Sequence, residues 1–285
     1  MKPLDRHVLG LSGGRDSAAL AVYMRRVRPA LDIEYFFTDT GKELPEVYDF
    51  LGRLEGFLGS SIVRLNPERD FDFWLKEYGH FLPSPQTRWC TRQLKLLPFK
   101  RWIRESLKAG QRVFSYVAIR SDEDQRQGLV AQDPNLIVAF PFREDGIDKQ
   151  GVLEILEGSG LGLPEYYRWR SRSGCTFCFF QQKIEWVRLK QEHPDAFEEA
   201  KSYEKSALSH GSPFTWSQGE SLEDLERPER VVKIKADYVA RLAREAGRRR
   251  PTNPLRPQGE SEDGVDIDEL FGEDEGGGAC LICHK

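Results

Sequence analysis

A glycine-rich segment near the start of the sequence has the residue types of a phosphate-binding turn. It consists of Ser12, Gly13, Gly14, Arg15, Asp16 and Ser17. Glycine lets the backbone approach an anion closely and a helix N-terminus presents unpaired N–H groups, so such a turn before a helix would bind phosphate. Ser12 and Ser17 would add hydroxyl donors, while Asp16 would cap the helix or help to hold Mg²⁺. The alternative is an ordinary Gly-Gly turn, since neither the Walker pattern nor GxGxxG is present.

The cysteines form a second set of residues with a chemical pattern. There are five, at Cys90, Cys175, Cys178, Cys280 and Cys283. An odd number of cysteines in a chain that reads as intracellular argues against a disulfide framework. Two CxxC pairs and a single cysteine indicate a metal or redox site instead. We expect a helix directly after Cys178, whose N-terminus would lower the pKa of that pair of thiols, and basic neighbours would do the same at Cys90.

Short strand-like segments alternate with helix-like segments over the first half of the sequence, and these elements must position the turn. Their Val, Ile, Phe and Tyr content predicts strands at 7–11, 33–37, 61–65 and 113–119. Helical spacing of apolar residues predicts helices at 16–27, 44–58 and 93–108. Such alternation indicates an α/β fold with a parallel sheet flanked by helices, in which ligands bind at the carboxyl ends of the strands. The loops after Leu11, Phe37 and Ile119 are therefore the expected binding loops.

The second half of the sequence predicts further helices and then a tail. The helices are expected at 149–157, 179–192, 194–205 and 231–246. The formal net charge of −4 conceals a basic stretch at 230–256 and an acidic stretch at 260–275. No apolar run reaches the roughly 20 residues of a membrane span, and no secretory signal is recognisable. We therefore expect a cytoplasmic protein without membrane contact.

Several motifs in order resemble the PP-loop superfamily, which includes the N-type ATP pyrophosphatases and the phosphoadenosine phosphosulfate (PAPS) reductase-like proteins. The superfamily signatures SGGxDS, DTG and GIRxDES have counterparts in SGGRDS, FFTDTGKELPEVYDF and YVAIRSDED, and RSGCTFC follows where relatives carry a cysteine pair. The resemblance implies an adenine-nucleotide alpha-hydrolase-like sheet. It divides the chain into a PP-loop ATP-binding domain at 1–145, a helical CxxC region at 146–246 and a flexible acidic tail at 247–285 that ends in CxxCH.

The resemblance also implies roles for residues at matching positions. The catalytic residues would be Asp16, Arg120 and Lys95. ATP and Mg²⁺ would be bound by Ser12, Gly13, Gly14, Arg15, Asp16, Ser17, Asp39 and Thr40. Plainer interpretations stay open, because Asp39 could simply form a turn with Gly41. Arg120 could instead be a surface arginine, and Lys95 a solvated lysine on a helix.

In the [4Fe-4S] members of this superfamily, a cysteine near the position of Cys90 joins a distant CxxC pair. Cys90, Cys175 and Cys178 would supply three ligands and leave one iron open for sulfur, whereas electron-transfer clusters usually have four ligands. A competing arrangement takes a fourth ligand from Cys280 or Cys283. The main alternative is a structural Zn²⁺ ion held by the two CxxC pairs.

The intact SGGRDS turn favours ATP cleavage, because PAPS reductases act on an already activated substrate and resemble degraded versions of it. The resemblance implies an ATP pyrophosphatase that adenylates a nucleic-acid oxygen and exchanges it for sulfur, closest in type to the DndC/SspD proteins of DNA phosphorothioation. A cysteine desulfurase would donate sulfur, DNA is favoured over tRNA, and a homo-oligomer or modification complex is compatible. Alternatives are a reductase of PAPS or its desphospho relative, with a tail cysteine as nucleophile, and a non-catalytic ATP- and cluster-binding subunit.

Overall fold

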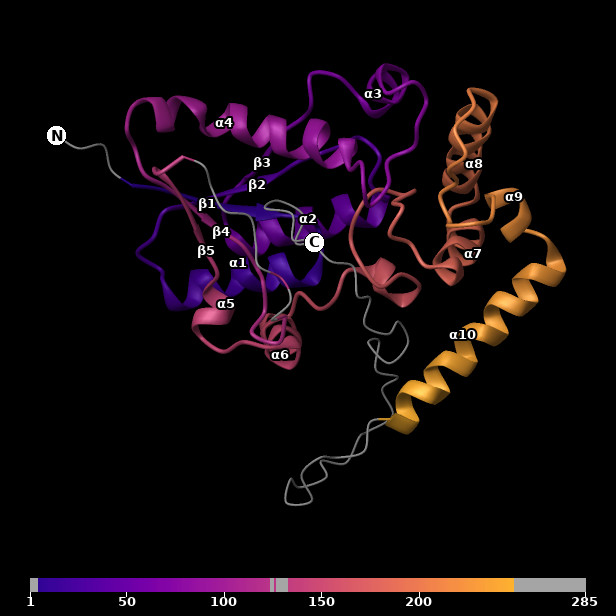
Figure 1. The fold of residues 1–285 in the computed structure, drawn as a ribbon. Helices are drawn as coiled ribbons and strands as arrows, with labels where there is room; N and C mark the ends of the chain where they lie inside the picture. Colours follow the sequence, from indigo (N-terminus) through magenta and orange to yellow (C-terminus); the bar gives the residue numbers. More distant parts are fainter. Residues whose placement is uncertain (1–4, 124–125, 127–132, 249–285) are drawn as a thin grey trace.

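The computed structural model describes residues 5–123, 126 and 133–248, with side chains as far as Arg244. At its centre lies a five-stranded sheet of order β3-β2-β1-β4-β5, in which every neighbouring pair is parallel. Helices lie on both faces of this sheet (Figure 1). The predicted α/β fold is therefore confirmed. The strands are β1 (Arg6–Leu11), β2 (Ile33–Phe37), β3 (Ile62–Arg64), β4 (Val113–Tyr116) and β5 (Leu136–Ala139).

Successive side chains of the strands enter two buried layers, one on each face of the sheet. In β1, Leu9 belongs to the main core, while its neighbour Val8 belongs to a smaller core with Phe99. Phe99 lies on α4, which covers one face, whereas α1 and α6 cover the other (Figure 1). Because both faces are covered, the strands are apolar at nearly every position. The helices that pack on the sheet include α1 (Arg15–Val27), α2 (Pro45–Leu58), α4 (Leu97–Lys108) and α6 (Lys149–Ser159).

The helix predicted at 93–108 is divided into two helical forms. A π-helical segment, η1 (Thr91–Leu96), leads directly into α4, and the N–H of Leu97 bonds to the carbonyl of Arg92. Pro98 explains the wider turn, because it has no N–H to donate to the carbonyl four residues before it. Single π-turns inside helices often occur at functional sites. Here the π-turn directly follows Cys90.

The strand predicted at 113–119 ends earlier, at Tyr116. The N–H of Val117 still bonds to the carbonyl of Ala139, but the N–H of Ile119 bonds back to Val117, so the chain turns there. Strand β5 was not predicted, since it is a four-residue edge strand that stops just before Pro141.

Two of the remaining helices precede residue 149, and the others form the C-terminal part of the described chain. The helix predicted at 179–192 begins instead at Lys183, because Gln182 and Glu185 form a capping box that fixes its start. Cys175 and Cys178 therefore lie in a loop, separated from the helix. These elements are α3 (Phe71–Glu77), α5 (Pro141–Glu144), η2 (Glu165–Arg168), α7 (Lys183–Glu192), α8 (Pro194–Ser209), α9 (Leu222–Leu225) and α10 (Pro228–Arg248).

One buried core joins the sheet to the C-terminal helices. Leu9 of β1, Val152 of α6, Trp186 of α7 and Tyr238 of α10 all belong to it. The core thus extends across the predicted domain boundary at residue 145, which stays a prediction. Most of the predicted tail, with Cys280 and Cys283, lies outside the described residues. Among the helices that the structure describes, none has the length and apolarity to cross a membrane.

Candidate functional site

The turn between β1 and α1 has glycine at two successive, closely packed positions. Gly13 has φ +72°, and a Cβ atom there would lie 2.5 Å from Cγ1 of Val47. A Cβ atom on Gly14 would lie 2.7 Å from the hydroxyl of Ser173. Neither position tolerates a side chain without a shift of its neighbours. The turn is therefore fitted both to helix α2 and to the loop that carries Cys175.

Hydroxyl groups brace this turn from within. The Ser17 hydroxyl, which is buried, donates to the carbonyl of Gly14 at 3.2 Å and accepts the N–H of Ser12 at 3.1 Å. The Ser12 hydroxyl accepts the N–H of Gly14 at 3.3 Å. Asp16 does not cap α1, because the N-cap is Gly14 and no side chain bonds there. The Mg²⁺ role of Asp16 stays a prediction.

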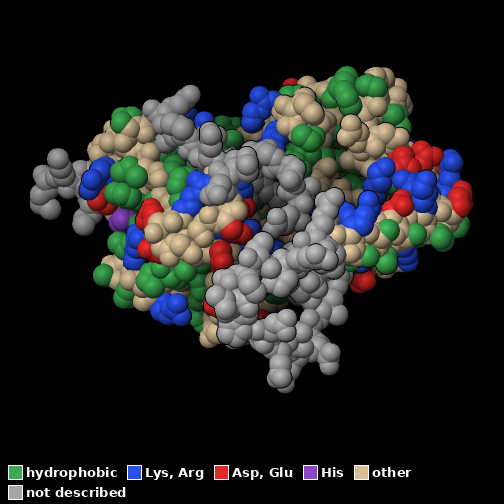
Figure 2. All heavy atoms as spheres, turned by 60° about the horizontal axis from the view of Figure 1, so that its bottom comes forward, with side chains coloured by type: hydrophobic (Ala, Val, Ile, Leu, Met, Phe, Trp, Pro, Cys, Tyr) green, Lys and Arg blue, Asp and Glu red, His purple; other side chains and the backbone are tan. Residues whose placement is uncertain are grey.

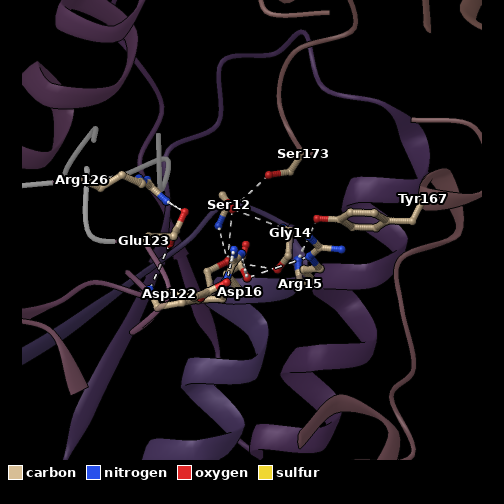
Figure 3. Close-up of polar contacts among 11 residues, drawn as sticks. Ser12, Gly14, Arg15, Asp16, Asp122, Glu123, Arg126, Tyr167 and Ser173 are labelled. Atoms are coloured by element: carbon tan, nitrogen blue, oxygen red, sulfur yellow. Dashed lines mark hydrogen bonds and ion pairs between the residues drawn. The ribbon is translucent and has the colours of Figure 1, made fainter. Parts of the chain in front are cut away.

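Arg120 comes from the loop after β4 and lies against the first turn of α1. Its guanidinium is 3.3 Å from the carboxylate of Asp16 and 2.9 Å from that of Asp122, and only 11% of its side chain is exposed. Burial alone would lower the pKa of Arg120, but the carboxylates around it, Asp16 most of all, outweigh this and raise that pKa above its ordinary value. A fixed cation therefore lies beside the turn. Figure 3 shows Asp16, Asp122 and Glu123 grouped there.

Asp39 and Thr40 follow β2, and the structure gives them different surroundings. One carboxylate oxygen of Asp39 accepts the N–H of Gly41 at 2.9 Å and the hydroxyl of Tyr48 at 2.7 Å, which is the turn chemistry considered as its alternative. Thr40 is buried and lies toward the cysteines instead. Its hydroxyl donates to Glu43 at 2.9 Å and is 3.3 Å from the sulfur of Cys175.

One cavity brings together the three cysteines of the described chain. The apolar part of its wall includes Phe71, Leu94, Phe177, Phe179 and Phe180. Its polar lining includes Thr40, Arg88, Cys90, Lys95, Ser173, Cys175 and Cys178. Lys95, which the sequence placed near the phosphates, thus lies among the cysteines. We call this the cysteine cavity.

Several contacts hold the CxxC loop against the loop after β2. The N–H of Thr176 donates to the carbonyl of Lys42 at 2.7 Å, and Glu43 pairs with Cys175 in an isolated antiparallel bridge. Arg170 is completely buried and donates to the carbonyls of Gly174 and Cys175 at 3.2 and 2.7 Å. The sequence favoured Arg170, with Arg168 and Arg172, for a nucleic-acid backbone path, whereas the structure buries Arg170 completely against the carbonyls of the CxxC loop.

The loop also contacts the glycine-rich turn. The Ser173 hydroxyl donates to the Ser12 hydroxyl at 3.1 Å, and Tyr166 donates to the carbonyl of Gly13 at 2.8 Å. The N–H of Arg15 donates to the Tyr167 hydroxyl at 3.2 Å (Figure 3). The Tyr-Tyr pair was the available signal for this contact, but nothing in its spacing named the partner.

The surroundings of Cys175 contradict the expected low thiol pKa. Burial raises the pKa of the Cys175 thiol well above its ordinary value, Glu43 raises it further, and Lys95 acts in the opposite direction. The helix that was expected to lower it begins only at Lys183. Glu43 itself is 8% exposed, and its second carboxylate oxygen has no hydrogen-bond partner among the described residues. Sequence reasoning missed Glu43 as well.

The donor chemistry of the cysteine cavity fits a sulfur-ligated group. Among the residues that the structure describes, no group of three or more His, Cys, Asp or Glu side chains is already arranged to hold a metal ion. Three cysteines around one cavity with aromatic walls have the donor chemistry of an iron–sulfur cluster. A four-cysteine zinc site would need Cys280 and Cys283, which lie outside the described residues. At the turn, the Asp16 and Asp122 oxygens are the hard donors that Mg²⁺ prefers.

Residues 6–129 match the family described as the phosphoadenosine phosphosulfate reductase domain. One uncharacterized protein of Methanocaldococcus jannaschii is 27% identical over 202 residues, which are 67% of this chain and 40% of that protein. A second uncharacterized protein of the same organism is 23% identical over 191 residues, which are 65% of this chain and 44% of that protein. An uncharacterized nin region protein of Escherichia phage lambda is 30% identical over 201 residues, 60% of this chain and 65% of its own length. The chain thus spans less than two thirds of these relatives.

Among solved structures, the phosphate complex of phosphoadenylyl-sulfate (PAPS) reductase from Candida auris aligns with a TM-score of 0.43 and 14% identity. The alignment covers 61% of this chain and 81% of that one. The family match supports the PAPS reductase-like, PP-loop superfamily for residues 6–129.

Proposed function

We propose that this chain cleaves ATP at the Ser12–Ser17 turn, adenylates an oxygen of a nucleic acid and replaces that oxygen with sulfur at the cysteine cavity. One observation carries the proposal. The Ser173 hydroxyl, next to the cysteine pair, bonds to Ser12 of the turn at 3.1 Å. The two places therefore adjoin, as a reaction that uses ATP and then sulfur on one acceptor needs. The family match over residues 6–129 supports the nucleotide half.

In the first step the acceptor oxygen attacks the α-phosphorus of ATP, the bond to the β-phosphate breaks, and pyrophosphate leaves. Negative charge builds on the leaving group, and the N–H groups at the start of α1 would bind it. Arg120 would exchange its carboxylate partners for phosphate oxygens, since its planar fork suits them. Asp16, released by that exchange, would hold Mg²⁺, which neutralises phosphate charge when bound.

In the second step sulfur at the oxidation level of hydrosulfide forms a bond to the acceptor, and AMP leaves with the original oxygen. This exchange needs no net oxidation or reduction. Cys90, Cys175 and Cys178 would hold a [4Fe-4S] cluster, whose iron without a protein ligand supplies a place for that sulfur. The aromatic wall would exclude water, which otherwise competes for the adenylated acceptor. A cysteine desulfurase is the proposed sulfur donor, and a thiol reductant would reduce the sulfur of its persulfide to hydrosulfide before the exchange. DNA, as in DndC/SspD-type phosphorothioation, is proposed before tRNA.

The second candidate is a reductase of PAPS or its desphospho relative, favoured by the description of the matching family. Such an enzyme would use a thiolate of Cys280 or Cys283 to attack sulfur, releasing the nucleotide. It would not need the complete pyrophosphate-binding turn. The third candidate, a non-catalytic subunit, would bind ATP and cleave nothing.

The test compares products from protein purified without oxygen. With ATP, Mg²⁺, sulfide and DNA or tRNA, we expect pyrophosphate and AMP, and loss of both with Asp16→Asn. Asp32→Asn, at an exposed loop position before β2, is the matched control and should keep them. Sulfite from PAPS that depends on the tail cysteines, with no pyrophosphate from ATP, would establish the reductase. Nucleotide binding without any product would establish the subunit.

A further inference from the structure

We propose that Arg88 and Arg172, both stacked on Phe180, form a clamp for the phosphodiester backbone of a nucleic acid at the cysteine cavity. The clamp rests on the proposed function, because it names the part of the protein that would bind the acceptor. Phe180 and Arg88 line the cavity together with the three cysteines. An acceptor bound there would place its reacting oxygen near the sulfur held in the cysteine cavity.

The geometry brings two cations from different segments to one ring. The guanidinium carbon of Arg88 lies 5.0 Å from the ring centre of Phe180, and that of Arg172 lies 5.3 Å from it. Arg88 is two residues before Cys90, and Arg172 is three before Cys175. Each arm of the cysteine site therefore contributes one arginine. A guanidinium stacked on a ring keeps its charge and its planar set of N–H donors, which suits phosphate oxygens.

The backbone at Arg88 is held in an unusual conformation. Its φ is +34°, a region that residues other than glycine rarely adopt. Hydrogen bonds on both sides maintain it, from the N–H of Arg88 to the carbonyl of Ser84 at 2.9 Å and from the N–H of Arg92 to that of Arg88 at 3.2 Å. Such conformations cluster at functional sites, where the surrounding structure enforces them. Here the result is an arginine placed over Phe180.

Several basic residues of the C-terminal helices form ion pairs with carboxylates. Lys190 and Lys201 both bond to Glu226, and Arg230 forms an ion pair with Glu220 at 2.5 Å. Figure 2 shows basic and acidic side chains interspersed at the right-hand end of the molecule. Such a mixed surface attracts a polyanion weakly. Arg88 and Phe180, by contrast, line the cysteine cavity itself, so the arginines on Phe180 lie where the acceptor would bind.

Binding measured without ATP tests the clamp separately from the reaction. The full chain would be titrated into fluorescent single-stranded DNA, single-stranded RNA and duplex DNA, and anisotropy followed at several salt concentrations. We expect Arg88→Gln and Arg172→Gln each to weaken binding about tenfold, since each loses a charge-assisted bond. Each should also reduce the slope of log affinity against log salt by about one. The strand type most affected identifies the source of the backbone.

Arg112→Gln is the matched control, because Arg112 also stacks on a phenylalanine, Phe114, but precedes β4 at the opposite end of the sheet. It should bind as the unaltered chain does. Phe180→Leu keeps both charges and should weaken binding less than either arginine substitution, which separates the clamp from misfolding. Unchanged affinity and salt slope in both arginine variants would overturn the clamp. Failure to release pyrophosphate from ATP would instead overturn the proposed function and leave the binding result standing.

Discussion

The glycine-rich turn and the cysteine cavity adjoin, yet they are built in opposite ways. The turn lies in one short stretch and is braced by its own residues, as in the bond between Ser17 and Gly14. The cavity is assembled from the loop after β2, the π-helical segment and the CxxC loop, which only tertiary contacts bring together. Arg170 and the pairing of Glu43 with Cys175 supply those contacts. A contiguous motif can thus stay intact while the neighbouring site is lost, and this difference can be tested.

Replacing Cys90 should have the largest effect and remove the bound group altogether. We expect protein purified without oxygen to contain about four irons and four sulfides per chain, and Cys90→Ser to contain almost none. ATP should still bind to that variant, because the turn is braced locally. Iron and acid-labile sulfide analysis, with calorimetric titration of ATP, measures both.

The tail cysteines provide the control for that experiment. If Cys90, Cys175 and Cys178 are the ligands, a Cys280→Ser, Cys283→Ser double variant keeps its iron. One zinc and no sulfide per chain, lost in the double variant, would replace the cluster with a four-cysteine zinc site.

The converse experiment distorts the glycine-rich turn and keeps the cysteine cavity intact. Gly13→Ala forces a methyl group toward Val47 at a positive φ, which should cost about 2–5 kcal/mol of unfolding free energy from strain and overpacking. A displaced turn should slow pyrophosphate release by about 100-fold. Iron content should stay unchanged.

Gly110 offers a matched control, because its φ is +71° and nothing lies within 4 Å of an added Cβ. Gly110→Ala should lose only about 1–2 kcal/mol in denaturant unfolding and release pyrophosphate normally. Equal losses in the two variants would mean that the contact with Val47 has no part in shaping the turn.

The same contrast explains what the sequence could predict. The turn and the strands β1 and β2 follow from local pattern, so they were predictable, whereas the end of β4 and the edge strand β5 were not. Glu43 contacts Cys175, which lies more than 100 positions away in the sequence, and Arg170 is completely buried. Neither property has a local signature in the sequence. Thr40 was assigned to ATP binding by resemblance, whereas its hydroxyl lies against Cys175. The start of α7 depended on a capping box at Gln182, which moved the helix away from the cysteines.

A pH experiment tests how Glu43 affects the Cys175 thiol in the cysteine cavity. The pKa of the Cys175 thiol is raised in the folded, metal-free protein. As pH rises above the ordinary value of 9.0, the unfolded chain therefore loses the thiol proton before the folded chain does. Folding stability contributed by the neutral thiol is therefore complete below that pH and is lost above it. Glu43→Gln removes a charge that raises this pKa, so the loss should become shallower. Alkylation of Cys175 at pH 8, followed by mass spectrometry, should become about threefold to tenfold faster.

Glu46→Gln is the control for that measurement, since Glu46 is another partly buried carboxylate nearby but pairs with His193. It should leave the Cys175 alkylation rate unchanged. An equal acceleration in both variants would indicate general loosening of the loop after β2 rather than an electrostatic effect of Glu43.

The smallest effect concerns the contact that joins the two regions. Removing one hydroxyl of the Ser12–Ser173 bond should cost about 0.5–1.5 kcal/mol of coupling, measured by a double-mutant cycle on ATP affinity. Ser171→Ala is the control, because Ser171 lies in the same loop but donates to Glu185 of α7 at 2.7 Å. If the Ser12–Ser173 bond couples the two sites, loading the cavity with iron should change ATP affinity in the unaltered chain and in Ser171→Ala. The change in ATP affinity should be smaller in Ser173→Ala. Identical responses in all three would mean that the turn and the cavity adjoin without influencing each other.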